Sequence, residues 1–392
     1  MAEILLKIIL AATFGAALVR SWVGVAAYYT LSLWYPQLIW YWAFGTLRSS
    51  LIVSIATILG FGKEVFLGKV DFLTIFKRQN IYIILLWISI VISYLFSPIE
   101  QGRTDNVMLS GSYLFAYFNR IFFFYFISVL LIDTKEKLHY LIICFLVVIL
   151  YYIYWSNEKY LSGGMLYGPR LRGPGPEGEE WTGQGGGPYT DENCFAMLFV
   201  MGIPFLFFMA NYYKNILIKG LLWGAIPFAW HSIFLTGSQG GLVGVGVVTV
   251  FIALRSRSKL LLSFMPVALL MAFLWQGGSF LHNRILESEL AEVQGESTAQ
   301  QRLNSWSAGT KMMLDHPLTG VGLGNFLQAY PLYSETTPHV AHNTFFQFSA
   351  ESGVLAGGMY MLLLLSLSRG YLTQIRIDTR VEDRFLSMAN EC

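Results

Sequence analysis

The chain has 392 residues, and its composition excludes an ordinary soluble protein. Only 13% of the residues are charged, whereas 55% are hydrophobic and 16% are aromatic. A soluble domain of this length would carry about 25% charged residues to hydrate its surface. Because 26 Lys and Arg nearly balance 24 Asp and Glu, the chain offers no basic surface for nucleic acid. The three cysteines are far apart and suggest neither a disulfide framework nor a metal site.

Apolar stretches recur from one end of the chain to the other, each close to the roughly 20 residues that a membrane-spanning helix needs. We therefore predict an all-α fold, a polytopic membrane helix bundle with about 10–11 transmembrane helices. The predicted spans are residues 4–19, 22–42, 45–62, 80–97, 112–132, 138–156, 193–212, 216–236, 239–254, 259–275 and 341–367.

Lysine and arginine collect in the loops on one side of these spans when the helices are counted along the chain. The clusters are Lys63, Lys69, Lys77 and Arg78; Lys135 and Lys137; Lys214 and Lys219; Arg255, Arg257 and Lys259; and Arg369, Arg376 and Arg380. Since basic loops stay in the cytoplasm, this side is predicted to be cytoplasmic. The opposite face receives the segments 98–111, 157–192 and 276–340, and loops this long are usually functional or disordered. Any chemistry is predicted to face outward.

The expected organisation has three parts. Residues 1–156 form the N-terminal membrane helices, and residues 157–275 combine a Gly/Pro-rich outer loop with the central membrane helices. Residues 276–392 contain a long outer loop with interfacial helices, the last membrane helix and a cytoplasmic tail.

The segment TTPHVAHNTFFQFSAESG, residues 336–353, opens the last span. Pro338 is suited to be its first helical residue, which would place His339 and His342 in the first turns on one face. A helix N-terminus keeps a histidine neutral, so these imidazoles could accept a proton, or they could simply anchor the helix at the membrane interface. Glu351 lies deeper in the same span, where an ionisable group marks function or a specific hydrogen-bonding role.

A second segment, residues 297–326, predicts an amphipathic helix that is capped by Ser297 or Thr298 and lies in the interface. Its predicted apolar stripe consists of residues at helical spacing: Leu303, Trp306, Thr310 and Met313. Arg302, near the start, could bind a phosphate through paired hydrogen bonds or could be a solvated surface charge.

Two segments are rich in glycine. Gly320, Gly322 and Gly324 imitate a nucleotide-binding loop, but no βαβ context surrounds them, so that interpretation is rejected. In TGSQGGLVGVGVV, residues 236–248, small residues predict close helix packing, with Gln239 as the polar residue at the outer end.

The segment 168–197 is too rich in glycine and proline for regular helix. Arg170 and Arg172 precede a group of glutamates, and Asp191 introduces the next apolar helix, where capping alone would explain it. These carboxylates could bind a cation, but their spacing matches no specific ligand pattern, and we predict no metal.

The order of LRGPGP, TDENCFAM, TGSQGG, RLNSW with DHPLTGVGLGNF, and AHNTFFQFSAESG resembles the O-antigen ligase family over almost the whole chain. Within that family it resembles the exosortase-associated O-glycosylation ligases. The resemblance implies a multi-pass transferase of the bacterial inner membrane, whose site faces the periplasm. Its partners would be a polyprenyl-diphosphate-linked glycan donor, a glycan, lipid or protein acceptor, and the lipid bilayer.

The resemblance also implies roles for individual residues. His342 corresponds to the histidine associated with catalysis, where it would orient or deprotonate the acceptor, with Asn343 to fix the imidazole and His339 in support. Arg302 corresponds to an arginine near the lipid-linked phosphate, where fixed cations stabilise the leaving diphosphate. Two further residues, Arg172 and Gln239, are expected to bind the substrate. Glu351 and Asp191 are expected to support the site. No cofactor, metal or nucleotide sugar is expected.

Two departures from the family pattern are visible. The family usually has SRG where this chain has SQG, so Gln239 stands where a second arginine would help to neutralise the diphosphate. The chain also stops soon after its last span, which predicts a truncated or divergent member. Two alternative functions are a polymerase that uses the same donor and, because Glu351 lies within a span, a polytopic transporter. The sequence shows no internal repeat of the kind that many transporters have.

Overall fold

The computed structural model describes residues 2–36, 48–99, 110–162, 192–255, 264–274 and 298–377, together with 173–174, 180–181 and 189. Nearly all of them are helical. The helices are α1 (Ala2–Val19), α2 (Ser21–Trp34), α5 (Ser49–Phe66), α6 (Arg78–Leu95), α7 (Gly111–Leu131), α8 (Lys135–Leu161), α9 (Glu192–Tyr212), α10 (Ile216–Thr236), α11 (Gln239–Arg255), α13 (Thr298–Asp315), α14 (Phe326–Ala329) and α15 (Thr344–Ile377). Two 3-10 helices, η1 (Phe72–Phe76) and η5 (Tyr330–Leu332), a helix over Phe264–Leu274, and the paired two-residue strands β1 (Gly173–Pro174) and β2 (Glu180–Trp181) complete the set.

The predicted helical membrane bundle is confirmed. Among the described residues, seven helices are long and apolar enough to cross a membrane, and three shorter apolar helices accompany them. Every predicted span coincides at least in part with a described helix.

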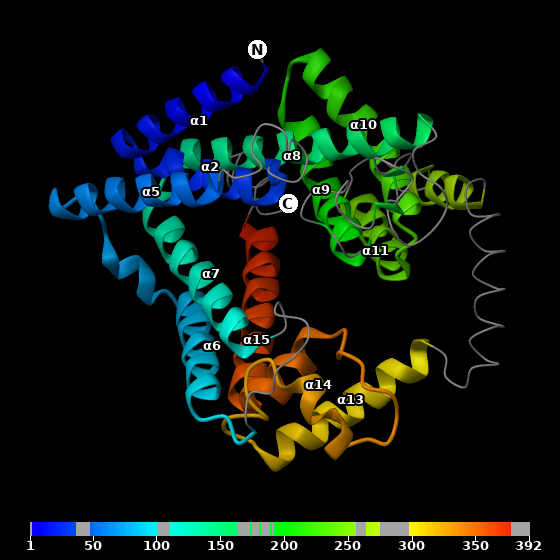
Figure 1. Cartoon of the computed structure of the whole chain (residues 1–392). Helices are drawn as coiled ribbons and strands as arrows, with labels where there is room; N and C mark the ends of the chain where they lie inside the picture. Colours follow the sequence, from blue (N-terminus) through cyan, green and yellow to red (C-terminus); the bar gives the residue numbers. More distant parts are fainter. Residues whose placement is uncertain are drawn as a thin grey trace. The chain divides into compact units, whose positions relative to one another are not determined.

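The chain divides into two compact units (Figure 1). Unit 1 comprises residues 1–69, 131–284 and 380–392, and unit 2 comprises residues 70–130 and 285–379. In the described part of the chain, unit 1 therefore contains α1, α2, α5, α8 to α11 and the helix over Phe264–Leu274, while unit 2 contains α6, most of α7, and α13 to α15.

The core of unit 1 lies between α8, α9 and α10, and its largest fully buried side chains include Tyr152, Phe195 and Phe199. α9 is the most buried of the candidate spans. Gly202 allows it to approach α8 closely, since a Cβ atom at this position would lie 2.7 Å from Cδ1 of Ile149.

The predicted close packing of α11 through small residues is confirmed at two positions. A Cβ atom on Gly241 would lie 2.6 Å from Cβ of Ala196, and one on Gly244 would lie 3.2 Å from Val200, so these glycines face α9. Gly246 has nothing within 4 Å, and its small size serves no helix contact in the described residues.

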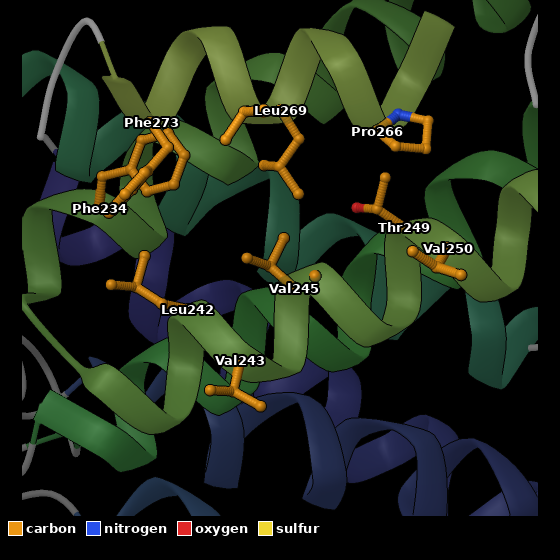
Figure 2. Close-up of a pocket in the computed structure, with 11 residues that line it drawn as sticks. Phe234, Leu242, Val243, Val245, Thr249, Val250, Pro266, Leu269 and Phe273 are labelled. Carbon is orange, nitrogen blue, oxygen red and sulfur yellow. The ribbon is translucent and has the colours of Figure 1, made fainter. Parts of the chain in front are cut away.

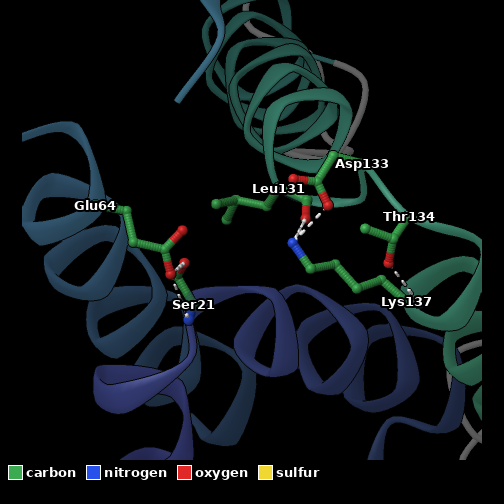
Figure 3. Close-up of polar contacts among 6 residues, drawn as sticks. All are labelled: Ser21, Glu64, Leu131, Asp133, Thr134 and Lys137. Atoms are coloured by element: carbon green, nitrogen blue, oxygen red, sulfur yellow. Dashed lines mark hydrogen bonds and ion pairs between the residues drawn. The ribbon is translucent and has the colours of Figure 1, made fainter. Parts of the chain in front are cut away.

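A single residue, Arg20, separates α1 from α2, and side chains at the end of α5 hold this turn. Lys63 Nζ donates to the last two backbone oxygens of α1, each at 2.8 Å. Ser21 Oγ donates to Glu64 Oε1 at 2.5 Å, as Figure 3 shows. The two Lys63 bonds satisfy backbone oxygens at the end of α1, which have no partner within the helix.

The start of α8 has a cap of its own, which Figure 3 also shows. Thr134 Oγ1 accepts from the backbone N–H of Lys137 at 3.4 Å, and Lys137 Nζ pairs with Asp133 Oδ1 at 2.6 Å. Contacts with residues close in the sequence therefore hold the Lys137 side chain at the start of α8.

Ring contacts bring this helix start to the same end of unit 1 as the turn between α1 and α2. The ring of Trp22, in α2, lies 5.6 Å from that of Tyr140, in α8, and the Tyr213 hydroxyl lies 3.0 Å from His139 Nε2. One end of unit 1, called here its basic end, thus carries residues from three predicted cytoplasmic clusters: Lys63, Lys137 and Lys214.

The opposite end of unit 1 is joined by neutral polar side chains. His231 Nδ1 lies 2.7 Å from Asn157 Oδ1, and Asn157 Nδ2 donates to Ser232 Oγ at 3.0 Å, which links the last turns of α8 and α10. Ser238 Oγ donates to Asn193 Oδ1 at 2.6 Å, which links the starts of α9 and α11. α8 and α10 therefore end at the same level, and α9 and α11 begin at the same level.

In unit 2, α6 packs along α7 and α15 through polar as well as apolar contacts. Trp87 Nε1 donates to Asn119 Oδ1 at 2.7 Å, between α6 and α7. Ser93 Oγ donates to the backbone oxygen of Glu351 at 2.5 Å, and Gln79, at the other end of α6, lies near Gly370. α15 therefore runs antiparallel to α6, and Arg78 and Arg369 share the basic end of unit 2.

α15 is broken at Gly353, where φ is 81° and ψ is 174°. The segment 316–325 fills the break: the N–H of Val321 donates to Ala350 O at 2.8 Å, the N–H of Gly322 donates to Glu351 O at 3.1 Å, and Pro317 O accepts from the N–H of Val354 at 2.9 Å. The predicted span is thus not one continuous helix.

The three glycines of GVGLG serve this packing. Gly320, Gly322 and Gly324 all have positive φ, which a side chain would disfavour. A Cβ atom on Gly320 would also lie 2.3 Å from Ala350 O. The glycines thus permit close approach to the broken helix, and their rejection as a nucleotide loop agrees with this role.

The predicted apolar stripe of α13 is correct at Trp306, which packs against the core of unit 2, but it is not the most buried face of the helix. Leu303 is 54% exposed, and the buried residues are offset from the predicted ones: Ser305, Ala308, Gly309 and Met312. The reason is that small side chains, rather than large ones, let the helix lie close to its neighbours. A Cβ atom on Gly309 would already lie 3.1 Å from the ring of Phe326.

Gly353→Ala should destabilise the protein by at least about 1–3 kcal/mol, because alanine strongly disfavours this backbone conformation and its Cβ would lie 2.6 Å from Pro317 O. Gly358→Ala is the matched control, since Gly358 lies in the same helix with nothing within 4 Å. It should be neutral or add about 0.5–1 kcal/mol. Thermal unfolding in detergent measures both, and equal midpoints would contradict the strained break.

The charge distribution predicts that the basic ends face the cytoplasm. In a variant without Cys144, Cys194 and Cys392, Ser307→Cys, on the exposed face of α13, should react with an impermeant thiol reagent added to spheroplasts. Lys214→Cys, at the basic end of unit 1, should react only after lysis. Reaction of the second variant in intact spheroplasts would reverse the orientation.

Candidate functional site

The segment 333–343, called here the strap, runs antiparallel along α13 in unit 2. Its first residue is held at the end of α13: Lys311 Nζ donates to Tyr333 O at 3.1 Å, and the Tyr333 hydroxyl donates to Asp315 Oδ2 at 2.9 Å. Burial and the neighbouring Asp315 carboxylate raise the pKa of Tyr333 to about 12, so the phenol remains a donor at neutral pH.

The far end of the strap is held one to three turns earlier on α13. Ser305 Oγ lies 3.2 Å from the backbone oxygen of His339, and Trp306 Nε1 donates to Ala341 O at 2.8 Å. The Trp306 ring also stacks on Phe346 of α15, with centroids 5.2 Å apart. The strap is therefore fixed between two helices.

The predicted start of the last helix at Pro338 is wrong. α15 begins at Thr344, after Asn343, whose Oδ1 accepts from the N–H groups of Phe345 at 3.0 Å and Phe346 at 3.4 Å. Asn343 is thus the helix cap, a strong preference of asparagine. His339 and His342 precede the helix and do not share a helical face. The strap carbonyls instead bond to α13, which keeps residues 339–341 non-helical.

His342 occupies an unusual backbone position. Its φ is 48°, in the left-handed region, and its side chain is exposed. Histidine visits this region more readily than most residues, although it still costs free energy. Ala341 on one side and Asn343 on the other are both fixed by hydrogen bonds, so the chain presents the imidazole outward immediately before the helix N-terminus.

Arg302 lies one turn before Ser305 and Trp306 on α13, at the spacing that places side chains on neighbouring positions of one face. Because the strap runs antiparallel to α13, this is the part of the helix that its last residues approach. The Arg302 Nε is buried and has no hydrogen-bond partner in the part of the chain that the structure describes. A buried donor without a partner costs free energy unless a ligand satisfies it.

Glu351 is buried two turns inside α15. Its carboxylate accepts from Gln347 Nε2 at 2.7 Å and is also bonded to the backbone amides of Gly324 and Phe326. It therefore links the broken helix to the glycine segment.

The remaining predicted residues are placed elsewhere. Gln239 is the exposed first residue of α11 and belongs to unit 1, whereas Arg302 and His342 belong to unit 2. Arg172 and Asp191 lie outside the described residues. Within the described part of the chain, no three potential metal ligands cluster.

Unit 1 also contains a cavity of about 370 Å³ between α10, α11 and the helix over Phe264–Leu274. Figure 2 shows side chains such as Leu242, Val245, Leu269 and Phe273 directed toward it, with Thr249 as a polar exception. The cavity suits hydrocarbon rather than a sugar or an ion.

A comparison with protein-family models finds a match, which includes these residues. Residues 224–361 match the model described as O-antigen ligase. The chain carries an O-antigen ligase domain. No curated protein and no solved structure matches significantly. The O-antigen ligase domain extends from α10 to the middle of α15, and it includes Gln239, Arg302, the strap and Glu351.

Two polar groups within the matched segment were missed by sequence analysis. Gln347 lies between Asn343 and Glu351 at four-residue spacing, which is the signal that could have identified it. The second is His231, which pairs with Asn157 near the end of α8. Asn157 and His231 each lie in the last turns of their helices, α8 and α10.

Arg302→Lys should lower ligase activity by about 10- to 100-fold, because lysine keeps the charge but loses the planar fork, and one charge-assisted bond contributes about 1.5–3 kcal/mol. Arg302→Ala should lose more. Arg369→Lys, exposed at the basic end, is the matched control and should have no effect. Wild-type turnover by Arg302→Ala, at equal protein levels in membranes, would exclude a phosphate role.

Proposed function

We propose that this O-antigen ligase transfers a glycan from a polyprenyl diphosphate carrier to an acceptor hydroxyl on the periplasmic face of the inner membrane. The observation that carries the proposal is the combination of a buried Arg302 Nε, which has no hydrogen-bond partner among the described residues, and an exposed His342 on adjoining parts of α13 and the strap. Both residues lie within the matched ligase domain.

The proposed reaction forms one bond and breaks one. The acceptor oxygen attacks the anomeric carbon of the glycan, and the bond from that carbon to the carrier phosphate breaks, with its electron pair passing to the diphosphate. The hydroxyl proton passes to the His342 imidazole. Negative charge therefore develops on phosphate oxygens, where a fixed cation stabilises the transition state most. Arg302 is the candidate for this role.

The other proposed contacts follow from residue type. Arg172 would add a second cation to the diphosphate, and Gln239 would donate a neutral hydrogen bond in place of an arginine. In this scheme arginines neutralise the charge, and no metal is needed. His339, whose backbone oxygen is near Ser305 Oγ, would support the strap.

The periplasmic location is proposed from the separation of charge and site within unit 2. Arg78 and Arg369 share one end of the α6–α15 pair, while the strap lies at the other. If the basic end stays in the cytoplasm, His342 faces outward. The transporter alternative has less support, since the cavity in unit 1 is lined almost wholly by apolar side chains.

The test is reconstitution in liposomes with a labelled polyprenyl-diphosphate-linked glycan and an acceptor. His342→Asn should reduce transfer by about 10² to 10⁴-fold, the range of general acid–base assistance. Asparagine tolerates the left-handed backbone, so the fold should be retained. His316→Asn, near the far end of α13, is the control.

The same assay separates the alternatives. A ligase gives one transfer per acceptor, whereas a polymerase gives carrier-linked products of increasing length. If His342→Asn recovers the wild-type rate at saturating acceptor, His342 only binds the acceptor. Absence of any transfer from the carrier, with folded wild-type protein, would contradict the proposed function.

A further inference from the structure

We infer that Gln347 and Glu351 are positioning residues for His342, acting through the backbone of Ala341. The inference rests on the proposed function, because it assigns a purpose to the orientation of the His342 imidazole. It assigns Gln347 a role that its position in an apolar helix would not otherwise suggest.

The first step is the bond between Gln347 and the strap. Gln347 Oε1 accepts from the backbone N–H of Ala341 at 3.2 Å, while the backbone oxygen of Ala341 accepts from Trp306 Nε1 at 2.8 Å. Both polar groups of the residue before His342 are therefore held, one from α15 and one from α13. The N–H belongs to the peptide plane before Ala341 and the oxygen to the plane that joins Ala341 to His342, so the two bonds together fix the backbone of Ala341 and the direction in which the chain enters His342.

The second step is the orientation of the Gln347 amide. A glutamine side chain can present either its oxygen or its nitrogen to a neighbour, and both choices have similar shape. Gln347 Nε2 donates to Glu351 Oε1 at 2.7 Å. Because a carboxylate only accepts, this bond requires the nitrogen to face Glu351, which turns the oxygen toward Ala341.

The third step is the support of Glu351. Its side chain is 6% exposed, and the backbone amides of Gly324 and Phe326 bond to its carboxylate. Its own backbone oxygen accepts from Ser93 Oγ and from the N–H of Gly322. Glu351 is thus fixed by the segment that fills the helix break, and it transmits this position to the strap.

The consequence for His342 is a conformation that its neighbours impose. A left-handed, non-glycine residue persists only where the surrounding structure holds it. Without the Gln347 bond, Ser305 and Trp306 would still attach the strap to α13, so the fold would remain while the imidazole could move. A misplacement of about 1 Å costs about 100-fold in rate.

An exchange of the two side chains tests the inference. Gln347→Glu places two carboxylates together, and Glu351→Gln can present either an oxygen or a nitrogen to Gln347, which leaves the Gln347 amide without a fixed orientation. Each single variant should therefore lose about 10- to 100-fold in kcat. The double variant Gln347→Glu/Glu351→Gln restores complementary partners: the carboxylate at position 347 accepts from Ala341 and from the amide at 351. It should recover to within a few fold of wild type. Gln328→Glu, exposed on α14, is the control for added charge.

A second measurement does not depend on activity. Hydrogen–deuterium exchange in peptides that cover residues 338–345 should be faster in Gln347→Ala than in wild type, since the Ala341 N–H loses its acceptor. Unchanged exchange, or a double variant no more active than either single one, would overturn the positioning role. If exchange rises as expected but His342→Asn has wild-type activity, the proposed function fails instead.

Discussion

The break in α15 at Gly353 is the constraint on which the rest of unit 2 depends. A helix that could cross a membrane cannot leave backbone groups unpaired, because no water is present to replace the lost bonds. The carbonyls of Ala350 and Glu351 are accordingly taken up by the amides of Val321 and Gly322. The chain must then pass from the end of α13 to the middle of α15. Gly320 and Gly322 allow this close approach, because they have positive φ and no Cβ atom. The segment with these glycines therefore supplies the hydrogen bonds that the broken helix lacks.

The site follows from the same requirement to satisfy polar groups. The strap lacks regular structure, and the side chains of Ser305, Trp306 and Gln347 take up its backbone groups instead. Each of these three side chains makes a structural hydrogen bond. The Arg302 Nε, by contrast, has no partner in the described part of the chain. The ligase domain therefore separates the groups that build the site from the groups that remain available to a substrate.

Hydropathy predicted the helices of this protein well, since an apolar stretch of sufficient length has few alternatives in a membrane. The small residues that bring α11 against α9 were also recognisable. The start of α15 was not, because Pro338 and Asn343 are both good helix-start signals and only the bonds from α13 to the strap decide between them. The buried face of α13 was missed for a related reason. Its contacts use Ser305, Ala308 and Gly309, which hydrophobic periodicity does not weight. Motif resemblance named Arg302 and His342. It did not name Gln347, whose amide bonds both to Ala341, the residue before His342, and to Glu351.

The surroundings of Glu351 also bear on the choice between enzyme and transporter. A carboxylate that binds a transported cation must offer its oxygens to that ion. Glu351 instead accepts from Gln347 and is bonded to two backbone amides, so protein donors already occupy the group. Its oxygens therefore face N–H donors of the protein rather than being left for a cation. An intramembrane acid in this setting organises the protein around it. That role is consistent with the proposed enzyme, whose candidate site lies at one end of the α6–α15 pair.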